Sequence, residues 1–511
     1  MTDGGCGGAG TPRIAARVLL ALVGLTCSDC AGDDRLDAAR HAGAGRAGAA
    51  AEVSAPAAGR GAGQRPGDAG DAGDAGGVGR KPFDAGTTST AQAGAGAAGD
   101  GGRSNGAGSS GAGAHEAGSS GDADTGTATG RVIGYFVAWG VYGRNYHVKN
   151  IVESGAAETL THINYAFANV TNGACAIGDS YAEYDRFYDA ATSVDGQPDT
   201  WDAGALRGSF HQLQKLKVMY PRLRVLISLG GWTWSAGFSA AAAPAQREAF
   251  VRSCIELFIT DARWAGLFDG IDVDWEYPAR CGNTCSDNPE DTQNFTALLA
   301  EFRRQLDAVR PGLELTIAAP AGADKVDAIE VNRIHPHLDA INLMSYDLHG
   351  PWEPRTNFHA ALHPVAADPD RALGFTTDEA VQLWLDRGTP AAKLVVGLPF
   401  YGRGWSGVAA SGDGLYQTAT AAASATYEAG IEDYEVLAEL GAEFMPFRHD
   451  EAQAVWVYSA STGVFWTYDD PMSIANKTRY ARERGLGGMM FWELSGDDAA
   501  GSLVQAIAGA R

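Results

Sequence analysis

The stretch Phe268-Asp269-Gly270-Ile271-Asp272-Val273-Asp274-Trp275-Glu276-Tyr277-Pro278 carries the strongest structural signal in this chain of 511 residues. In its centre, acidic residues at positions 272, 274 and 276 alternate with large apolar residues at positions 271, 273 and 275. Such alternation is typical of a β-strand on which the three acids share one face. Apolar helix patterns before and after it predict a parallel sheet buried on both faces, rather than a solvated strand face. Buried carboxylates repel one another and lose hydration, so this face indicates an acid catalyst with supporting carboxylates.

From residue 131 onward, short aliphatic or β-branched segments alternate with helical patterns. The eight candidate strands are Val132–Val137, His162–Ala168, Arg224–Ser228, Gly270–Asp274, Glu314–Ala318, Ala340–Met344, Leu394–Leu398 and Gly488–Trp492. One helix is marked by an apolar stripe from Phe295 to Val309, and another begins at the capping-box pattern Thr376-Thr377-Asp378-Glu379. Strand–helix alternation of this kind predicts an α/β fold, a (β/α)8 TIM barrel, with its active site where the strands end.

The span 131–511 is longer than the ~250 residues typical of such a barrel, so an insertion is required. We place it at residues 402–467, between the seventh and eighth strands of a barrel domain that covers residues 130–511. The insertion is rich in aromatic residues, namely Tyr416, Tyr427, Tyr434, Trp456, Tyr458, Phe465 and Trp466. This composition predicts a small α+β subdomain.

Two segments precede the barrel. Residues 1–30 contain basic residues followed by a short apolar run that ends at Cys27, which predicts a signal peptide or a lipoprotein leader. Cys27 and Cys30 are both candidates for lipid attachment, so secretion and anchoring to a bacterial outer membrane both stay open. Residues 31–129 are dominated by Gly, Ala, Ser and Asp, and they predict a disordered linker. No segment is long and apolar enough to predict an integral membrane span.

The charge balance narrows the range of partners. Asp and Glu number 62 against 39 Lys and Arg, giving a net charge of -23 and a pI near 4.8. Such a chain is poorly suited to nucleic acid and well suited to neutral substrates. We find no phosphate loop or dinucleotide fingerprint, and His162, His335 and His349 lack metal-ligand spacing. We therefore expect a monomer that needs neither cofactor nor metal.

Four cysteines lie in the predicted barrel domain. Cys254 falls in an apolar helical register and is expected to be a buried small hydrophobe, whereas Cys175 is expected to be free in a loop. Cys281 and Cys285 flank three residues just after the acidic strand, and in an exported protein they could close a local disulfide loop.

Several motifs together resemble one family. Asp269-x-x-Asp272-x-Asp274-x-Glu276 resembles the signature of glycoside hydrolase family 18, the chitinases. The other similar motifs are Ser228-Leu229-Gly230-Gly231, Met344-Ser345-Tyr346-Asp347, Gly487-Gly488-Met489-Met490-Phe491-Trp492-Glu493, and Gly134-Tyr135 through Tyr142-Gly143-Arg144-Asn145-Tyr146. The last of these and the aromatic insertion, which is similar to the chitinase insertion domain, point to the bacterial and fungal branch. The motifs occur in order at strand ends, and the resemblance covers residues 131–511.

The resemblance implies a reaction with retention of configuration in which the substrate's own acetamido group is the nucleophile. Glu276 would donate a proton to the glycosidic oxygen and then activate water. Asp274 would hold the acetamido N–H, and Asp272 would share a proton with Asp274. Tyr346 would donate a hydrogen bond to the acetamido oxygen. Asp269, at the start of the strand, is expected to be structural.

The resemblance also implies a set of sugar contacts. Trp492 would form the floor beneath the distorted sugar, with simple core packing as the alternative, and Asp347 would bind a sugar hydroxyl. The remaining candidates for substrate binding are Tyr135, Trp139, Trp232, Tyr277, Met344, Trp352 and Arg403. For the loop residues Trp139, Trp232, Trp234 and Trp352, ordinary packing is an equal alternative.

The function expected from these residues is a chitinase acting on chitin and chitooligosaccharides. The first alternative is an endo-β-N-acetylglucosaminidase of the same family, which would cut glycans instead. The second is a chitin-binding lectin without activity, which the presence of the acid Glu276 disfavours.

Overall fold

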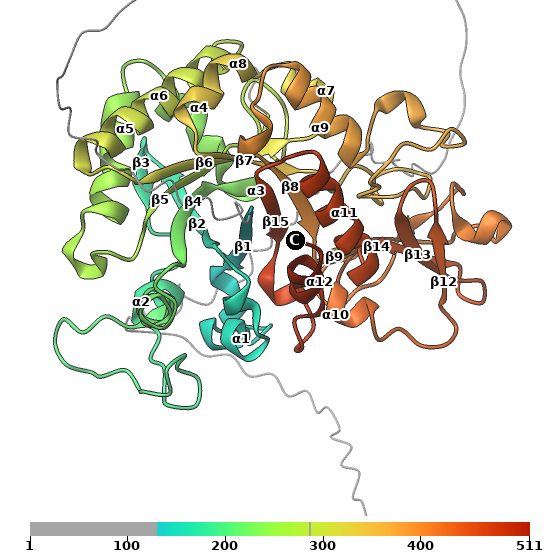
Figure 1. Cartoon of the computed structure of the whole chain (residues 1–511), viewed down its shortest axis with the longest axis horizontal. Helices are drawn as coiled ribbons and strands as arrows, with labels where there is room; N and C mark the ends of the chain where they lie inside the picture. Colours follow the sequence, from blue (N-terminus) through green and yellow to red (C-terminus); the bar gives the residue numbers. More distant parts are fainter. Residues whose placement is uncertain (1–129, 286–287) are drawn as a thin grey trace, which may run out of the picture. The chain divides into compact units, whose positions relative to one another are not determined.

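The computed structural model describes residues 130–285 and 288–511 (Figure 1). The predicted leader at residues 1–30 and the predicted linker at residues 31–129 lie outside the described residues. Within the described ranges, every helix is too short or too polar to cross a bilayer.

Eight parallel strands close into a barrel. They are β1 (Arg131–Val137), β2 (His162–Thr171), β4 (Arg224–Gly230), β5 (Gly270–Asp274), β6 (Glu314–Pro320), β7 (Ala340–Met344), β8 (Leu394–Pro399) and β15 (Gly488–Trp492). The order β1-β15-β8-β7-β6-β5-β4-β2 is closed by pairing of β1 with β2. The predicted (β/α)8 barrel is therefore confirmed, and each predicted strand is one of these eight. The short strand β3 (Ala174–Ala176) adds an antiparallel hairpin to the end of β2.

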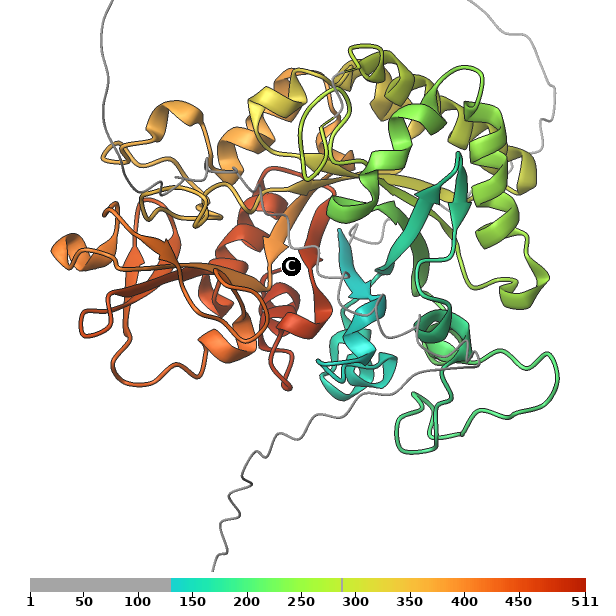
Figure 2. The same ribbon diagram turned by 180° about the vertical axis from the view of Figure 1, so that it is seen from behind.

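Helices surround the strands (Figures 1 and 2). They are α1 (Val148–Glu153), α2 (Gly208–Met219), α3 (Gly231–Trp234), α4 (Phe238–Ala242), α5 (Arg247–Cys254), α6 (Asp291–Val309), α7 (Ala323–Val326), α8 (Val331–Ile334), α9 (Thr377–Asp386), α11 (Pro471–Glu483) and α12 (Ser502–Ala510). The apolar stripe of α6 is buried as expected, except that Val309 at the end of the helix is 41% exposed. The backbone N–H of Glu379 donates to the Thr376 hydroxyl at the start of α9, as the capping-box pattern predicts.

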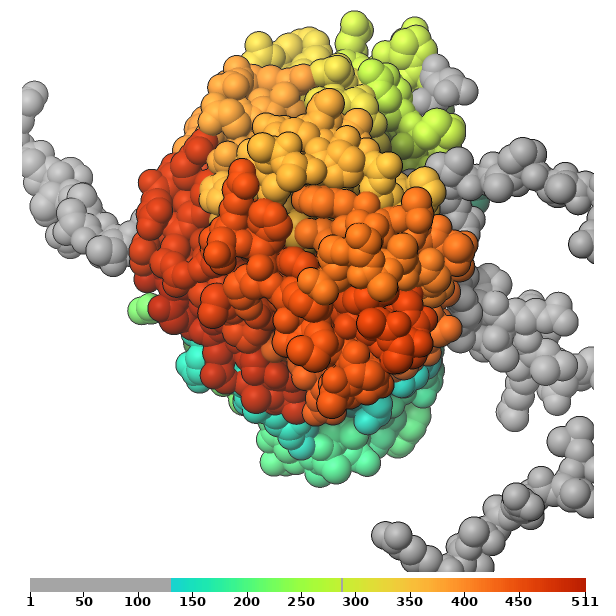
Figure 3. Space-filling model, turned by 90° about the vertical axis from the view of Figure 1, so that its right-hand side faces the viewer, coloured from blue at the N-terminus to red at the C-terminus, as the bar shows by residue number. Residues whose placement is uncertain are grey.

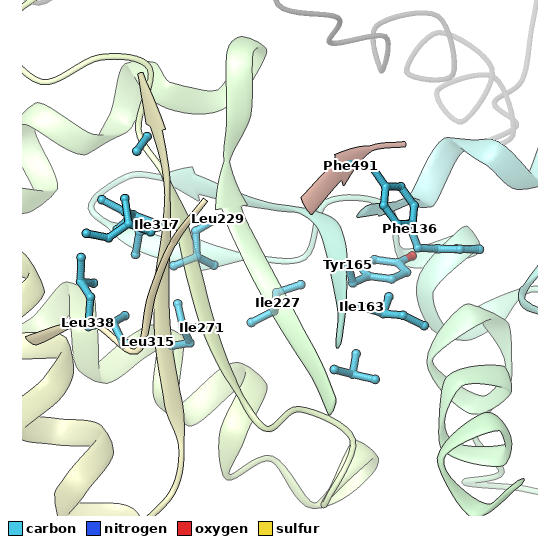
Figure 4. Packing of buried hydrophobic residues seen from close by; sticks show 14 of the residues in the cluster. Phe136, Ile163, Tyr165, Ile227, Leu229, Ile271, Leu315, Ile317, Leu338 and Phe491 are labelled. Atoms are coloured by element: carbon cyan, nitrogen blue, oxygen red, sulfur yellow. The ribbon is translucent and has the colours of Figure 1, made fainter. Parts of the chain in front are cut away.

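The apolar face of the acidic strand packs outward against the helices. Ile271 is aligned with Ile227 of β4 and Leu315 of β6, and all three are fully buried (Figure 4). The Trp275 ring stacks on Phe238 of α4 and meets Phe295 of α6 edge-on. Because side chains alternate along a strand, this packing turns the acids at 272 and 274 into the barrel.

The insertion forms a second sheet between β8 and β15. Its strands are β9 (Tyr401–Ser406), β10 (Ala421–Ala422), β11 (Ile431–Asp433), β12 (Met445–His449), β13 (Ala454–Ser459) and β14 (Val464–Tyr468), with the short helix α10 (Tyr434–Leu437). The order is β10-β9-β14-β13-β12, and β11 also pairs with β9. Trp405, Trp456 and Phe465 are buried in its core. Figure 3 shows the face on which the insertion (orange) adjoins the C-terminal elements (red). The second sheet thus lies between the seventh and eighth barrel strands.

Two disulfides occur among the described cysteines. Cys281 and Cys285 are bonded to each other, as expected for the local pair. Cys254 is fully buried as predicted, but Cys175 is not free, because these two residues form the second disulfide. The hairpin strand β3 packs against the end of α5, where the Cys175 N–H donates to the Ser253 hydroxyl at 2.9 Å. A contact across 79 residues of sequence is set by tertiary packing and leaves no local signal.

The two disulfides predict different effects on stability. Replacing Cys175 and Cys254 by serine should lower the free energy of unfolding by about 2–4 kcal/mol, because a long loop of the unfolded chain is released. Replacing Cys281 and Cys285 should have a smaller effect, because their sequence separation is only 4. Urea unfolding of both double variants measures the difference. A larger loss from the short loop would contradict the prediction.

Candidate active site

The deepest acid, Asp272, is fully buried and is held from four other strands. Its Oδ2 accepts hydrogen bonds from the hydroxyls of Tyr135 on β1 and Ser228 on β4, both at 2.8 Å. Its Oδ1 accepts from the Thr316 hydroxyl on β6 at 2.5 Å and from the Asn342 amide on β7 at 3.2 Å. Four donors on four strands, of which only β4 and β6 pair with β5, satisfy the carboxyl group inside the barrel.

Asp272 was predicted to share a proton with Asp274, and its own hydrogen bonds are to other strands. Both oxygens of Asp272 are engaged with other strands, and no hydrogen bond joins the two carboxyls in the part of the chain that the structure describes. Burial raises the pKa of Asp272, although the four donors partly oppose that shift. In this arrangement Asp272 is anchored to the barrel and not to its neighbour on β5.

The next two acids are buried with unused hydrogen-bonding capacity. Asp274 and Glu276 are each only 4% exposed, and among the described residues Asp274 Oδ1 and Glu276 Oε2 have no hydrogen-bond partner. Burial, followed by the charges of Glu276 and Asp272, raises the pKa of Asp274 well above its usual range. Burial also raises the pKa of Glu276 to about 7. Unpaired buried carboxyl oxygens with raised pKa values are typical of a catalytic site.

The backbone of Glu276 is fixed by the turn after β4. Its N–H donates to the Ser235 hydroxyl at 2.9 Å, and that hydroxyl is also 2.9 Å from the Gly231 carbonyl oxygen. Gly230 has a φ of 100°, and a Cβ there would lie 2.5 Å from the Asp274 carbonyl oxygen. Only glycine permits this close approach, which explains why glycines follow Ser228 in the sequence.

Asp347 connects the barrel to the insertion. Its carboxyl group accepts hydrogen bonds from the Tyr401 hydroxyl at 2.7 Å and from Arg403 Nε at 2.6 Å, both on β9. Burial raises the pKa of Asp347, but the Arg403 charge and the hydrogen bonds from His359 and Arg403 together outweigh it and hold the pKa below its usual value. The Arg403 guanidinium also lies over the Trp352 ring, 5.1 Å from its centroid. Asp347 is therefore a buried, paired carboxylate beside the acids of β5.

Trp492 is packed among aromatic rings at the end of β15. It stacks on Phe167 with ring centroids 5.6 Å apart, and it also contacts Tyr135 and Trp139. This packing fixes the indole as one wall of the cavity at the centre of the site. The full lining of that central cavity is Tyr135, Phe167, Trp232, Asp274, Glu276, Ala318, Met344, Tyr346, Tyr401 and Trp492.

Two further cavities share walls with the central one. The insertion-side cavity is lined by Trp139, Arg144, Phe400, Tyr401, Tyr427, Glu428, Ile431, Asp433, Trp492, Glu493 and Gly496. The loop-side cavity, of about 180 Å³, is lined by Trp232, Tyr277, Cys281, Pro320, Ala321, Gly322, Asp324, Lys325, Met344, Tyr346, Asp347, Leu348, Trp352, Glu353 and Phe375. Trp492 lines both the central and the insertion-side cavity, and Trp232 lines both the central and the loop-side cavity. The three cavities therefore form a row.

The structure brings most of the predicted site residues to this row. All of them line one of the three cavities except Asp272, which lies deeper, and Arg403, which acts through Asp347. Trp234 lines none of the three. Asp269 lies at the opposite end of β5, where its carboxylate accepts from Lys217 Nζ and from the Val225 N–H.

Sequence reasoning missed Tyr401 and Phe167. Tyr401 stands two residues before Arg403, so the alternation of a strand would have placed both side chains on one face. Phe167 lies inside the hydrophobic run of β2, and nothing in the sequence distinguishes it from the core residues around it.

The row of cavities has the groups required for acid–base chemistry on a neutral ring. Burial raises the pKa of Glu276 to near neutrality, Asp274 lies two residues before it at the end of β5, and Trp492 offers an aromatic face. In residues 130–285 and 288–511, no three His, Cys, Asp or Glu side chains are grouped so that they could hold a metal ion.

Comparison with known proteins identifies the family. The sequence model of glycosyl hydrolases family 18 matches residues 131–497. The chain belongs to this family. Chitinase C of Streptomyces lividans is 46% identical over 384 residues, which cover 74% of this chain and 59% of the relative. Chitinase 63 of Streptomyces plicatus is 45% identical, over 73% of this chain and 59% of its own length. The chain thus spans less than two thirds of these relatives.

A solved structure supports the same assignment. The catalytic domain of the psychrophilic chitinase B from Arthrobacter TAD20 has a TM-score of 0.70 and is 39% identical. The match covers 75% of this chain and 95% of that domain. The resemblance that the motifs predicted is confirmed at the level of family and fold.

The Asp347–Arg403 pair gives a prediction for stability. Replacing Arg403 by methionine leaves the Asp347 carboxylate buried without its cation, and it should lower the free energy of unfolding by about 3–5 kcal/mol. The double variant with Asp347→Asn and Arg403→Met should lose less, because no charge is left unpaired. Urea unfolding of both variants measures this. A single variant as stable as the wild type would contradict the prediction.

Proposed function

We propose that this protein is a chitinase that hydrolyses β-1,4 bonds between N-acetylglucosamine units, with Glu276 as general acid and base. The observation that carries the proposal is the position of Glu276. It is a buried carboxyl group of raised pKa, beside Asp274, in a cavity walled by Trp492. Family membership and the named chitinases among its relatives support the choice of substrate.

The proposed reaction retains the anomeric configuration. Glu276 donates its proton to the glycosidic oxygen as the bond from that oxygen to the anomeric carbon breaks. The acetamido oxygen of the same sugar attacks the anomeric carbon and forms a cyclic oxazolinium ion. Glu276, now a carboxylate, takes a proton from water as the water adds to the anomeric carbon and the ring opens. The proton returned to Glu276 completes the cycle.

Asp274 and Tyr346 would stabilise the cyclic intermediate. The unpaired Oδ1 of Asp274 suits the acetamido N–H, whose positive charge grows as the ring closes. Within the described residues, the hydrogen bond of the Tyr346 hydroxyl is a weak one, 3.8 Å from the Met490 sulfur, so the hydroxyl is available to the acetamido oxygen. Because both groups are fixed before substrate binds, they stabilise the developing charge with little reorganisation.

The first test removes the acid. Glu276→Gln should reduce hydrolysis of chitohexaose by at least ~10³-fold, because the amide cannot donate the required proton, while binding of the oligosaccharide persists. Hydrolysis is measured by mass spectrometry of the products, and binding by calorimetry. A high-mannose glycoprotein serves as the comparison substrate. Rapid hydrolysis by the variant would exclude Glu276, and wild-type activity on the glycoprotein alone would exclude a chitinase.

The second test is the pH profile. The pKa of Glu276 is raised to about 7, so the acid form that donates the proton predominates below that pH. The value of kcat/KM should therefore fall about tenfold per pH unit above neutrality, since it reports the free enzyme. The negative charge of Asp347 contributes to the raised pKa, so Asp347→Asn should move this alkaline limb to lower pH. A limb that stays in place or moves upward would contradict the assignment.

A further inference from the structure

We propose that the disulfide-closed loop Cys281–Cys285 is the wall of the active site on the leaving-group side, where it holds Trp232 and Tyr277 for the sugar units that are released. The loop would thus determine how much the sugar units on the leaving-group side contribute to substrate binding and to the rate of hydrolysis. This inference rests on the chitinase activity proposed above and identifies a specificity element of the same site.

The loop is tightly constrained by bonds of its own. Cys281 and Cys285 are joined by a disulfide and also form an antiparallel bridge, and the Gly282 N–H donates to the Thr284 carbonyl at 3.0 Å. On the side toward the strand, the Arg280 N–H donates to the Tyr277 carbonyl. Arg280 Nε donates to the Asp324 carbonyl at 2.8 Å, which ties the segment to α7. A ring of five residues with these anchors has little conformational freedom.

The loop rests directly on the catalytic strand end. A Cβ placed at Gly282 would lie 2.5 Å from the carbonyl oxygen of Glu276 and 3.2 Å from the ring of Trp232. The first distance, under 3 Å, leaves no space for a side chain, and the second is tighter than most van der Waals contacts, so the backbone at Gly282 lies close to both groups. The loop therefore joins the backbone of the acid to the indole that lines two of the three cavities.

The loop lies on one particular side of the bond to be cut. In the proposed reaction, the sugar that is attacked lies on Trp492 in the central cavity. The leaving group lies beyond Glu276, away from Trp492. We assign that direction to the loop-side cavity, because Trp232 and Tyr277, the residue after Glu276, line it together with Cys281, whereas Trp492 does not. Trp492 instead lines the insertion-side cavity, whose lining contains no residue of the loop.

The loop-side cavity has the chemistry of a sugar site. The aromatic rings of Trp232, Tyr277 and Trp352 line it together with the cation of Lys325, whose Nζ lies 5.5 Å from the centroid of the Tyr277 ring. Aromatic rings contribute binding energy only when they are held in place, because ordering a mobile side chain costs entropy. The disulfide keeps the loop against Trp232 before substrate arrives.

The test compares two double variants on two substrates. Cys281→Ser with Cys285→Ser opens the loop, and Cys175→Ser with Cys254→Ser opens the other disulfide as the matched control. Chitohexaose places sugar on both sides of Glu276, whereas a 4-nitrophenyl glycoside of chitobiose places only the aryl group on the leaving side. The measured quantities are kcat, KM and the ratio of products from the hexaose.

We expect the open-loop variant to lose about tenfold in kcat/KM on chitohexaose and to change its product ratio, while it stays within about twofold of the wild type on the aryl glycoside. The control variant should match the wild type on both substrates when activity is expressed per folded molecule. Equal losses on the two substrates, or no loss on either, would overturn the proposal.

A second variant covers failure of the first to fold. Arg280→Ala removes the hydrogen bond that ties the loop to α7 and lies outside all three cavity linings, and it should show a selective loss of the same kind on chitohexaose. An equal effect on both substrates would again overturn the proposal. The wild-type enzyme separates this inference from the function on which it rests, since a wild type inactive on chitohexaose would refute the chitinase assignment itself.

Discussion

The burial of three carboxyl groups, two on β5 and one just past its end, is the constraint on which the rest of the site depends. A carboxyl group inside a barrel is stable only when donors surround it or when it keeps its proton. The protein uses both solutions. Asp272 receives four hydrogen bonds from four other strands, whereas Asp274 and Glu276 have raised pKa values and unused oxygens. The donors to Asp272 explain why polar residues interrupt the hydrophobic runs of those strands.

A second buried charge, that of Asp347, links the insertion to the active site. Asp347 follows β7, and the residues that pair with it, Tyr401 and Arg403, are on the first strand of the insertion. An unpaired Asp347 would cost several kcal/mol in this position. The insertion therefore supplies the side chains that pair with a buried charge of the barrel. The charge of Asp347 in turn raises the pKa of Glu276 further.

The sequence was sufficient for the features that repeat along a strand or helix. The alternation at 270–276 predicts both the buried apolar face and the acid face, and the eight short aliphatic runs are the eight barrel strands. Features set by tertiary packing could not be predicted from the sequence. The Cys175–Cys254 disulfide joins residues 79 apart, and the donors to Asp272 come from strands whose neighbours are known only once the barrel closes. The close approach of Gly282 to the Glu276 carbonyl oxygen could not be predicted either, because a glycine in a loop can be required for many different structural reasons.

The geometry of β5 also bears on the origin of the nucleophile. A protein nucleophile must reach the anomeric carbon from the face opposite the leaving group, while the acid approaches the glycosidic oxygen. Asp274 is the last residue of β5 and Glu276 follows it by two residues, so both side chains enter the central cavity from the same wall. Asp347 is held by Arg403 and Tyr401, and Asp272 lies below with both oxygens engaged. None of these carboxyls is both unengaged and on the opposite wall, where Trp492 and Phe167 stack instead. An aromatic wall can support a ring but cannot attack it, so this arrangement favours a nucleophile carried by the substrate itself.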